Sequence, residues 1–147
     1  MPEVTRMIKF LLQKKALIKI TFWLWLLFVA IVSSLPNLPT QKINIWDEPF
    51  RLDYLEHFGV FFILSGLFVF WKADKESIFH IKNQLIFVLA LTLYAIVDEL
   101  HQLWIPGRSY NPLDLTYNLL GCFAGIYITN RILRKMVSKW HEKNDSL

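Results

Sequence analysis

The sequence predicts an all-α integral membrane protein, folded as a bundle of four transmembrane helices. Three observations lead to this prediction: four long apolar runs, a composition that is 54% hydrophobic but only 19% charged, and a one-sided distribution of lysine and arginine. The mean hydropathy of +0.36 is too apolar for an ordinary soluble domain of this length. The chain contains no internal repeat or low-complexity tract, so we expect one domain over residues 1–147.

The apolar runs predict membrane-spanning helices at residues 16–35, 54–71, 82–102 and 113–133. About twenty helical residues cover about 30 Å, the thickness of a bilayer core. The second and third runs have short apolar cores, so a soluble helical bundle is the alternative for them. A cleaved signal peptide is the alternative for the first run, but this run is long and no A-x-A site follows it. Residues 4–12 predict an interfacial helix or an extension of the first span.

Charge asymmetry predicts the orientation of the helices. Thirteen of the sixteen basic residues fall in the segment through Lys19, in the loop between the second and third runs, or from Arg131 onward. The other two loops hold only Lys42, Arg51 and Arg108. The positive-inside rule therefore predicts both termini in the cytoplasm, with a basic cytoplasmic tail at residues 134–147. Membrane topology also explains the net charge of +4, so we expect no nucleic-acid partner.

Polar residues gather at the predicted outer ends of three helices, where ionisable groups are functional candidates by default. Helical spacing places Asp53 and His57 on one face of the second helix. Gly121 and Gly125 allow a neighbouring helix to approach the fourth helix closely. The predicted binding residues are Asp53, His57, Gln102, Arg108, Asp114 and Asn118. The candidates for general acid–base catalysis are Asp98, Glu99 and His101.

Each of these residues has a structural alternative. Asn111 and Pro112 are typical of an N-cap and first helical position, so Asp114 can belong to a capping box. Arg108 can neutralise nearby acids, Glu99 can be a solvated rim residue, and the histidines can be structural. Two histidines and several carboxylates are suitable zinc ligands, so a metal is the alternative for this site. Because the sequence contains neither H-x-x-E-H nor H-E-x-x-H and no glycine-rich phosphate loop, we expect no metal and no cofactor.

The stretch from Val97 to Arg108 contains D-E-x-x-Q and P-x-R, and the next helix carries D-x-x-x-N-x-x-G from Asp114 to Gly121. Together with the D-x-x-x-H-F element that begins at Asp53, this pattern resembles the VanZ-like family of teicoplanin-resistance-protein-like membrane proteins. One departure is Trp104, which stands where phenylalanine is common in that family.

The resemblance implies a multi-pass protein of the bacterial cytoplasmic (inner) membrane, with a link to teicoplanin susceptibility but no defined reaction. Two functions stay open. The first is an extracytoplasmic-side polar pocket that binds a cell-envelope headgroup or amphiphile, such as a lipid-linked sugar or a lipoglycopeptide. The second is a membrane-embedded envelope-modifying enzyme that uses Asp98, Glu99 and His101. The lipid bilayer is the expected partner, and a transport role would require a homo-oligomer.

Overall fold

Four long helices and one β-hairpin make up the part of the chain that the structure, a computed structural model, describes: residues 13–37, 42–45, 48–73 and 81–144. The helices are α2 (Lys15–Ser33), α3 (Asp53–Lys72), α4 (Ile81–Gln102) and α5 (Pro112–Asn144). The hairpin consists of β1 (Lys42–Ile45) and β2 (Glu48–Arg51). The predicted all-α bundle is confirmed, while the predicted interfacial helix at residues 4–12 lies outside the described residues.

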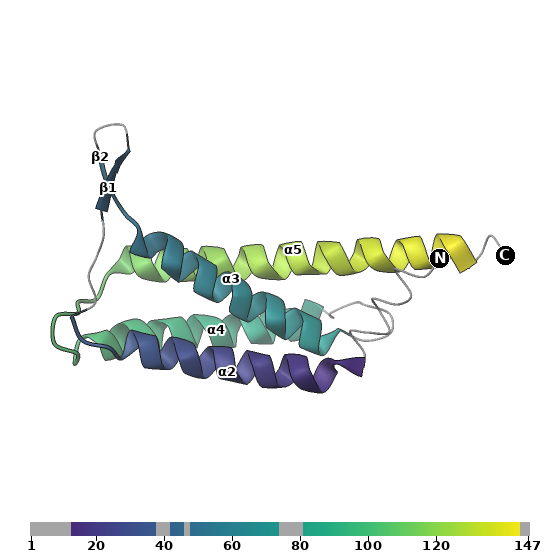
Figure 1. Cartoon of the computed structure of the whole chain (residues 1–147), viewed down its shortest axis with the longest axis horizontal. Helices are drawn as coiled ribbons and strands as arrows, with labels where there is room; N and C mark the ends of the chain where they lie inside the picture. Colours follow the sequence, from purple (N-terminus) through teal and green to yellow (C-terminus); the bar gives the residue numbers. More distant parts are fainter. Residues whose placement is uncertain (1–12, 38–41, 46–47, 74–80, 145–147) are drawn as a thin grey trace.

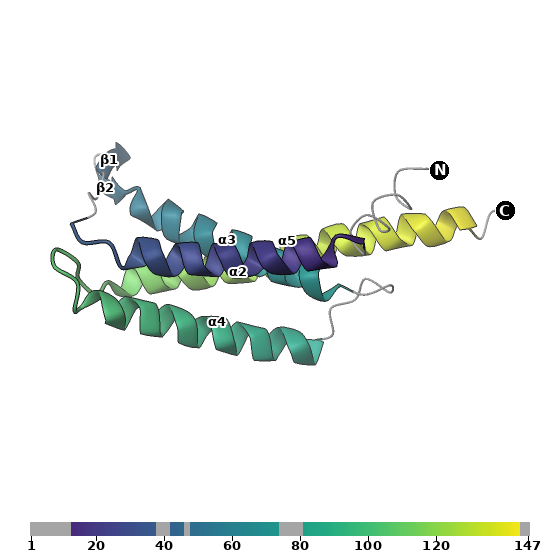
Figure 2. The same ribbon diagram turned by 60° about the horizontal axis from the view of Figure 1, so that its bottom comes forward.

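The helices lie lengthwise beside one another and alternate in direction, as Figures 1 and 2 show. Ser33, Asp53, Gln102 and Pro112 therefore lie at one end of the bundle, which we call the polar end. The other end, where α2 begins and α3 ends, is called the basic end. This arrangement brings together the helix ends that carry the predicted site residues.

The outside of the bundle is apolar. Leucines on α2 and α4 leave much of their side chains uncovered, for example Leu24 at 61% exposure and Leu93 at 62%. A soluble monomer rarely exposes contiguous apolar surface of this extent. Three of the described helices are long and apolar enough to cross a membrane: Lys15–Ser33, Asp53–Lys72 and Gln84–Gln102. The fold is therefore that of a membrane protein, and the predicted cytoplasmic location of the termini stays a prediction.

Helix α5 differs from the other three helices. It falls short of the hydropathy of a membrane span because polar and small residues, among them Asp114, Asn118 and Gly121, interrupt its apolar sequence. These residues are buried inside the bundle, so the helix can still present its apolar side chains to lipid. The fourth span at residues 113–133 stays a prediction. The helix itself continues to Asn144, because the segment after Leu133 contains no proline or glycine that would end it.

The most extensive helix pair is α3 with α5, and small residues make their close contact possible. A Cβ atom added at Gly121 would overlap the carbonyl oxygen of Phe58, and one added at Gly125 would overlap Ser65 and the carbonyl oxygen of Phe62. Main chain of α3 therefore lies directly against α5, as the predicted glycine motif requires.

An aromatic cluster fills the core toward the basic end. The rings of Phe68 and Phe87 stack with centroids 3.5 Å apart, and Phe22 lies 5.6 Å from Phe68. Buried apolar side chains of α5, among them Leu133 and Met136, belong to the same core. The basic end is thus packed with apolar groups, and the buried polar groups are concentrated at the polar end.

The hairpin, which the sequence analysis did not predict, follows α2 and precedes α3 in the chain, and it projects from the polar end near the start of α3 (Figure 1). Its strands pair in antiparallel register, with Lys42 opposite Arg51 and Ile45 opposite Glu48. Strand β2 ends at Arg51, two residues before α3 begins at Asp53. The guanidinium of Arg51 therefore lies beside the start of that helix, where it bonds to Asp53.

Candidate functional site

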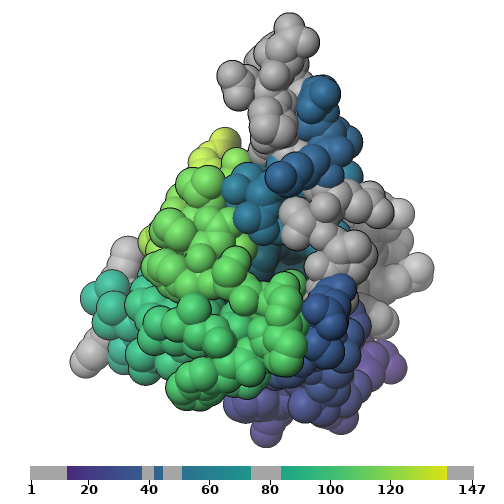
Figure 3. All heavy atoms as spheres, turned by 90° about the vertical axis from the view of Figure 1, so that its left-hand side faces the viewer, coloured from purple at the N-terminus to yellow at the C-terminus, as the bar shows by residue number. Residues whose placement is uncertain are grey.

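A cavity of about 350 Å³ opens at the polar end, and all four helices contribute to its wall. Figure 3 views this end of the molecule, where the segment between α4 and α5 lies beside α2. One part of the lining is apolar: Phe28, Val29, Val32, Val60 and Phe61. The other part is polar: Ser33, Asp53, Glu56, His57, Asp98, Gln102, Arg108 and Asn118. The volume lies in the range of small-molecule pockets.

Arg108 reaches the cavity from a turn between α4 and α5. The N–H of Arg108 donates to the carbonyl of Ile105 over 3.1 Å, and Gly107 adopts a φ of +77°, which favours glycine. A Cβ at Gly107 would also collide with the side chain of Asn37, whose N–H donates to the carbonyl of Pro106. The predicted turn is confirmed. Its contact with Asn37, just after α2, fixes the position of the main chain from which the Arg108 side chain extends.

The guanidinium of Arg108 makes no ion pair with any acid among the described residues, and its buried Nε has no hydrogen-bond partner there. Its charge acts on Asp98, Glu99 and Asp114 only from a distance. The alternative in which Arg108 neutralises these acids therefore involves no direct ion pair in this structure, and it stays open as an interaction at longer range. The Nε–H group of Arg108 is therefore available to donate a hydrogen bond to a ligand in the cavity.

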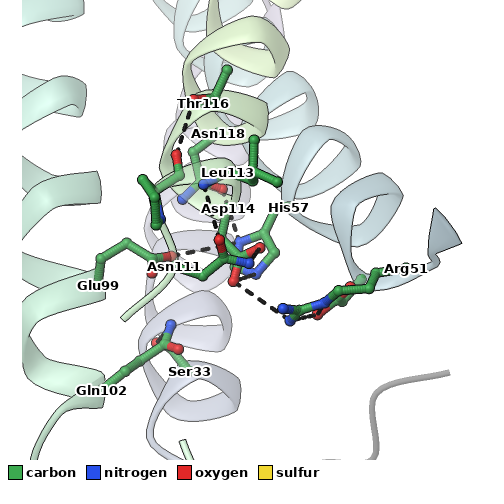
Figure 4. Close-up of polar contacts among 12 residues, drawn as sticks. Ser33, Arg51, His57, Glu99, Gln102, Asn111, Leu113, Asp114, Thr116 and Asn118 are labelled. Atoms are coloured by element: carbon green, nitrogen blue, oxygen red, sulfur yellow. Dashed lines mark hydrogen bonds and ion pairs between the residues drawn. The ribbon is translucent and has the colours of Figure 1, made fainter. Parts of the chain in front are cut away.

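His57 is the centre of a buried polar cluster between α3, α4 and α5, drawn in Figure 4. Its Nδ1 lies 3.1 Å from Oδ1 of Asn118 and 3.9 Å from Oε1 of Glu99. Its Nε2 lies 3.6 Å from Oδ2 of Asp114. Because an amide oxygen only accepts hydrogen bonds, Nδ1 carries the proton in the contact with Asn118. Nε2 is then directed toward Asp114.

Glu99 is completely buried, at 0% exposure, so the alternative of a solvated rim residue is wrong. Neither carboxylate oxygen has a hydrogen-bond partner among the described residues, although the main-chain N–H of Asn111 lies close to the carboxylate. Asp98 and Glu99 point in different directions, because successive residues of a helix are rotated by about 100°. Asp98 therefore reaches the cavity, and Glu99 faces His57. A buried carboxylate with so few partners requires compensation from a proton or a cation.

Asp114 is hydrogen-bonded to the capping side chain of Asn111 and also faces the cluster. Oδ1 of Asn111 accepts the N–H of Leu113 over 3.0 Å, and Nδ2 of Asn111 donates to Oδ1 of Asp114 over 2.8 Å. Asn111 is thus the N-cap, as predicted. Its amide orients the Asp114 carboxylate, and the second oxygen of that carboxylate is left to face His57.

Arg51 extends the cluster toward the hairpin. Its Nε donates to both carboxylate oxygens of Asp53 over 3.1 Å, and its guanidinium lies 3.9 Å from Oδ2 of Asp114. The hydrogen bond with Asp53 raises the pKa of Arg51 above its ordinary value, so the residue remains charged. The sequence analysis treated Arg51 only as a loop charge.

The remaining predicted residues lie at the cavity or beside it. Nε2 of Gln102 donates to Oγ of Ser33 over 3.3 Å, which ties the end of α4 to the end of α2. Ser33 is also close to the carboxylate of Asp98. His101 does not line the cavity; its ring lies 6.2 Å from that of Trp104, which is 82% exposed.

The structure thus brings together all six predicted binding residues, five as cavity lining and Asp114 through its contact with His57. Of the acid–base candidates, Asp98 lines the cavity, Glu99 faces His57, and His101 lies outside the cavity lining, although its charge acts on Asp98. The sequence analysis missed Ser33 and Arg51 as members of the site. Ser33 belongs to the S-S-x-P element that also fits the family resemblance, but a serine at a helix end and a charge in a loop do not by themselves indicate a site.

Four packed helices, an apolar exterior and a polar cluster at one end define the chain as a helical membrane protein with a buried polar site. The VanZ/LLP1 family profile matches residues 16–134, and the chain belongs to that family. The resemblance seen in the sequence is therefore confirmed, and the matched range contains every predicted site residue. No curated protein and no solved structure matches the chain.

Proposed function

We propose that the cavity at the polar end binds the headgroup of an anionic amphiphile of the cell envelope. The observation that carries the proposal is the cavity itself, which joins an apolar wall to a polar wall at the end of membrane-type helices. A lipid-linked sugar or a lipoglycopeptide has this division between a chain and a hydrophilic head. The proposed location is the outer leaflet of a bacterial cytoplasmic membrane.

Arg108 supports an anionic headgroup. It is the cavity residue with a permanent positive charge and a buried Nε that has no partner in the described part of the chain. A guanidinium binds phosphate or carboxylate oxygens with two parallel hydrogen bonds. Gln102 and Asn118 add amides for hydroxyl groups, and the unpartnered Nδ2 of Asn118 is one such donor.

The apolar wall supports an amphiphile over a soluble anion. Phe28 lines the cavity and is also 49% exposed on the outside of α2. The cavity therefore borders the surface that we assign to lipid. An alkyl chain attached to a headgroup can lie along Phe28 and Val32 while the headgroup meets Arg108.

The Arg108→Ala substitution should weaken binding of farnesyl phosphate, a short amphiphile with an anionic head, by roughly 30-fold or more. Removal of one partner from a buried charged contact costs about 2 kcal/mol or more, which corresponds to this factor. Titration calorimetry of the full chain in detergent measures the change. Arg108→Lys should recover part of the affinity, because it restores the charge but not the two-pronged geometry.

Two controls separate a specific site from general attraction. Arg131→Ala removes an exposed arginine of α5 far from the cavity and should leave farnesyl phosphate binding unchanged. Farnesol, which has the same chain without the charge, should bind the unaltered protein weakly. Equal binding by the Arg108→Ala and unaltered proteins would contradict the proposal. Teicoplanin, tested in the same way, shows whether a lipoglycopeptide is accepted.

A second candidate function is an envelope-modifying enzyme, favoured by the position of Asp98 in the cavity wall. Since His101 lies outside the lining, the imidazole nearest to the acids is that of His57. Asp98→Asn keeps the shape of the side chain and removes the titrating acid. Retained binding with lost turnover of a bound envelope lipid would favour the enzyme, and unchanged turnover would exclude Asp98 as its acid or base.

The proposed orientation places the polar end outside the cytoplasm and both termini inside. A fluorescent protein fused after Leu147 should therefore fluoresce in the cytoplasm, and alkaline phosphatase fused there should be inactive. The same two reporters inserted after Asn37, near the polar end, should give the opposite result. An active phosphatase at the C-terminus would overturn the orientation and, with it, access from the outer leaflet.

A further inference from the structure

We propose that His57, Glu99 and Asp114 form a binding site for a divalent transition-metal ion, for which Zn²⁺ is the best fit. One possible ligand atom from each residue lies within 4.8 Å of the other two. The three residues come from three different helices, α3, α4 and α5. Ligand atoms around zinc at bonds of about 2.0–2.2 Å lie roughly 3.5 Å apart, so small side-chain movements complete the coordination.

The burial of the cluster distinguishes it from a chance group of surface acids. Glu99 is 0% exposed and Asp114 is 4% exposed, while His57 keeps 17% of its side chain accessible. Both oxygens of Glu99 lack hydrogen-bond partners among the described residues. Two carboxylates at this depth carry more negative charge than one imidazole can balance. A divalent cation between them balances both.

Neighbouring groups already orient two of the three ligands. Nδ1–H of His57 donates to Oδ1 of Asn118, which leaves the lone pair of Nε2 for a metal. Nδ2 of Asn111 donates to Oδ1 of Asp114, which leaves Oδ2 of that carboxylate facing His57. Hydrogen bonds of this kind hold ligands in place at zinc sites.

The ligand chemistry selects the metal. One imidazole nitrogen with two carboxylates suits zinc and similar transition metals, whereas Mg²⁺ and Ca²⁺ prefer oxygen ligands alone. Three protein ligands leave a fourth position for water or another ligand, as in catalytic zinc sites. His57 and Asn118 also line the cavity, so the ion would lie beside it. This inference is independent of the proposed headgroup binding.

The test uses the full chain in detergent, stripped with a chelator and then titrated with Co²⁺ or Zn²⁺. We expect one tightly bound ion per chain and the visible absorption of four-coordinate Co²⁺. Glu99→Gln and His57→Asn, both close in shape to the original residues, should weaken binding by more than ~100-fold. Asn118→Ala, which removes only a supporting hydrogen bond, should weaken it by about 10- to 100-fold.

Matched controls exclude adventitious binding. Glu142→Gln, near the far end of α5, and His101→Asn make the same chemical changes at residues outside the cluster and should leave the affinity for Co²⁺ unchanged. On the unaltered chain, Zn²⁺ should raise the thermal midpoint and Mg²⁺ should not, a readout that needs no variant. Unaltered chain that retains no ion and is not stabilised by Zn²⁺ would overturn the proposal, and the cluster would then be a metal-free ion pair. Binding that survives both Glu99→Gln and His57→Asn would overturn it as well.

Discussion

Gly121→Ala is expected to lower the free energy of unfolding by about 3 kcal/mol, at the upper end of the usual cost of overpacking. The added methyl group would meet the carbonyl oxygen of Phe58, which is main chain and cannot rotate away. Helices α3 and α5 would have to separate to accept it, and with them the elements that carry His57 and Asn118. Unfolding of the detergent-solubilised protein, followed by circular dichroism during an SDS titration, measures the loss.

Gly59→Ala provides the matched control, because it makes the same substitution in α3 where no atom lies within 4 Å of the added Cβ. Alanine is the better helix former, so this variant should be as stable as the original or gain roughly 0.5–1 kcal/mol. Similar losses for the two variants would mean that the glycines act through helix propensity. The close approach of α3 and α5 would then not be the cause of the stability loss in Gly121→Ala.

His57→Leu is expected to destabilise the fold by about 2–3 kcal/mol, the cost of leaving buried polar groups without a partner. Among the described residues, Glu99 would keep no close side-chain partner, and Asp114 would keep Arg51 and Asn111. Leucine fills a similar volume, so the loss comes from the unpaired polar groups and not from a cavity. The same SDS titration measures it, at a pH where carboxylates are ionised.

A second substitution tests this explanation. In the double variant His57→Leu with Glu99→Met, the buried charge is removed with its partner, and part of the lost stability should return. His101→Leu is the control, since that histidine lies next to Trp104 and outside the cluster. If the double variant is less stable than His57→Leu alone, the interaction between residues 57 and 99 does not stabilise the fold.

The helices could be predicted from sequence because lipid imposes a simple rule on them. A run of apolar residues must be long enough to cross the bilayer, and three of the four predicted runs agree with α2, α3 and α4 to within two residues. The end of α5 could not be found in this way. Hydropathy reports where a helix leaves the membrane, and nothing in the residues after Leu133 ends the helix there.

The site could be predicted only in part. Helix ends with acids, histidines and an arginine at one depth indicated the polar end, and the cavity contains most of them. The burial of Glu99 was not predictable, because it depends on how α4 is rotated against α5. Arg51 is brought to the site by a hairpin whose strands have only four residues each, too few for a clear alternation of polar and apolar residues. The contacts of His57 in α3 with the two helices α4 and α5 are likewise a property of packing and not of spacing.

Phe28, which faces both the cavity and the exterior of α2, has a consequence for how affinity is measured. A ligand that arrives sideways from the membrane is dissolved in a thin two-dimensional phase before it binds. The quantity that governs occupancy is then its mole fraction among the lipids or detergent. An apparent Kd in bulk units should rise in proportion to the amount of micelle present, whereas a Kd expressed as the mole fraction of ligand in the micelle should stay constant.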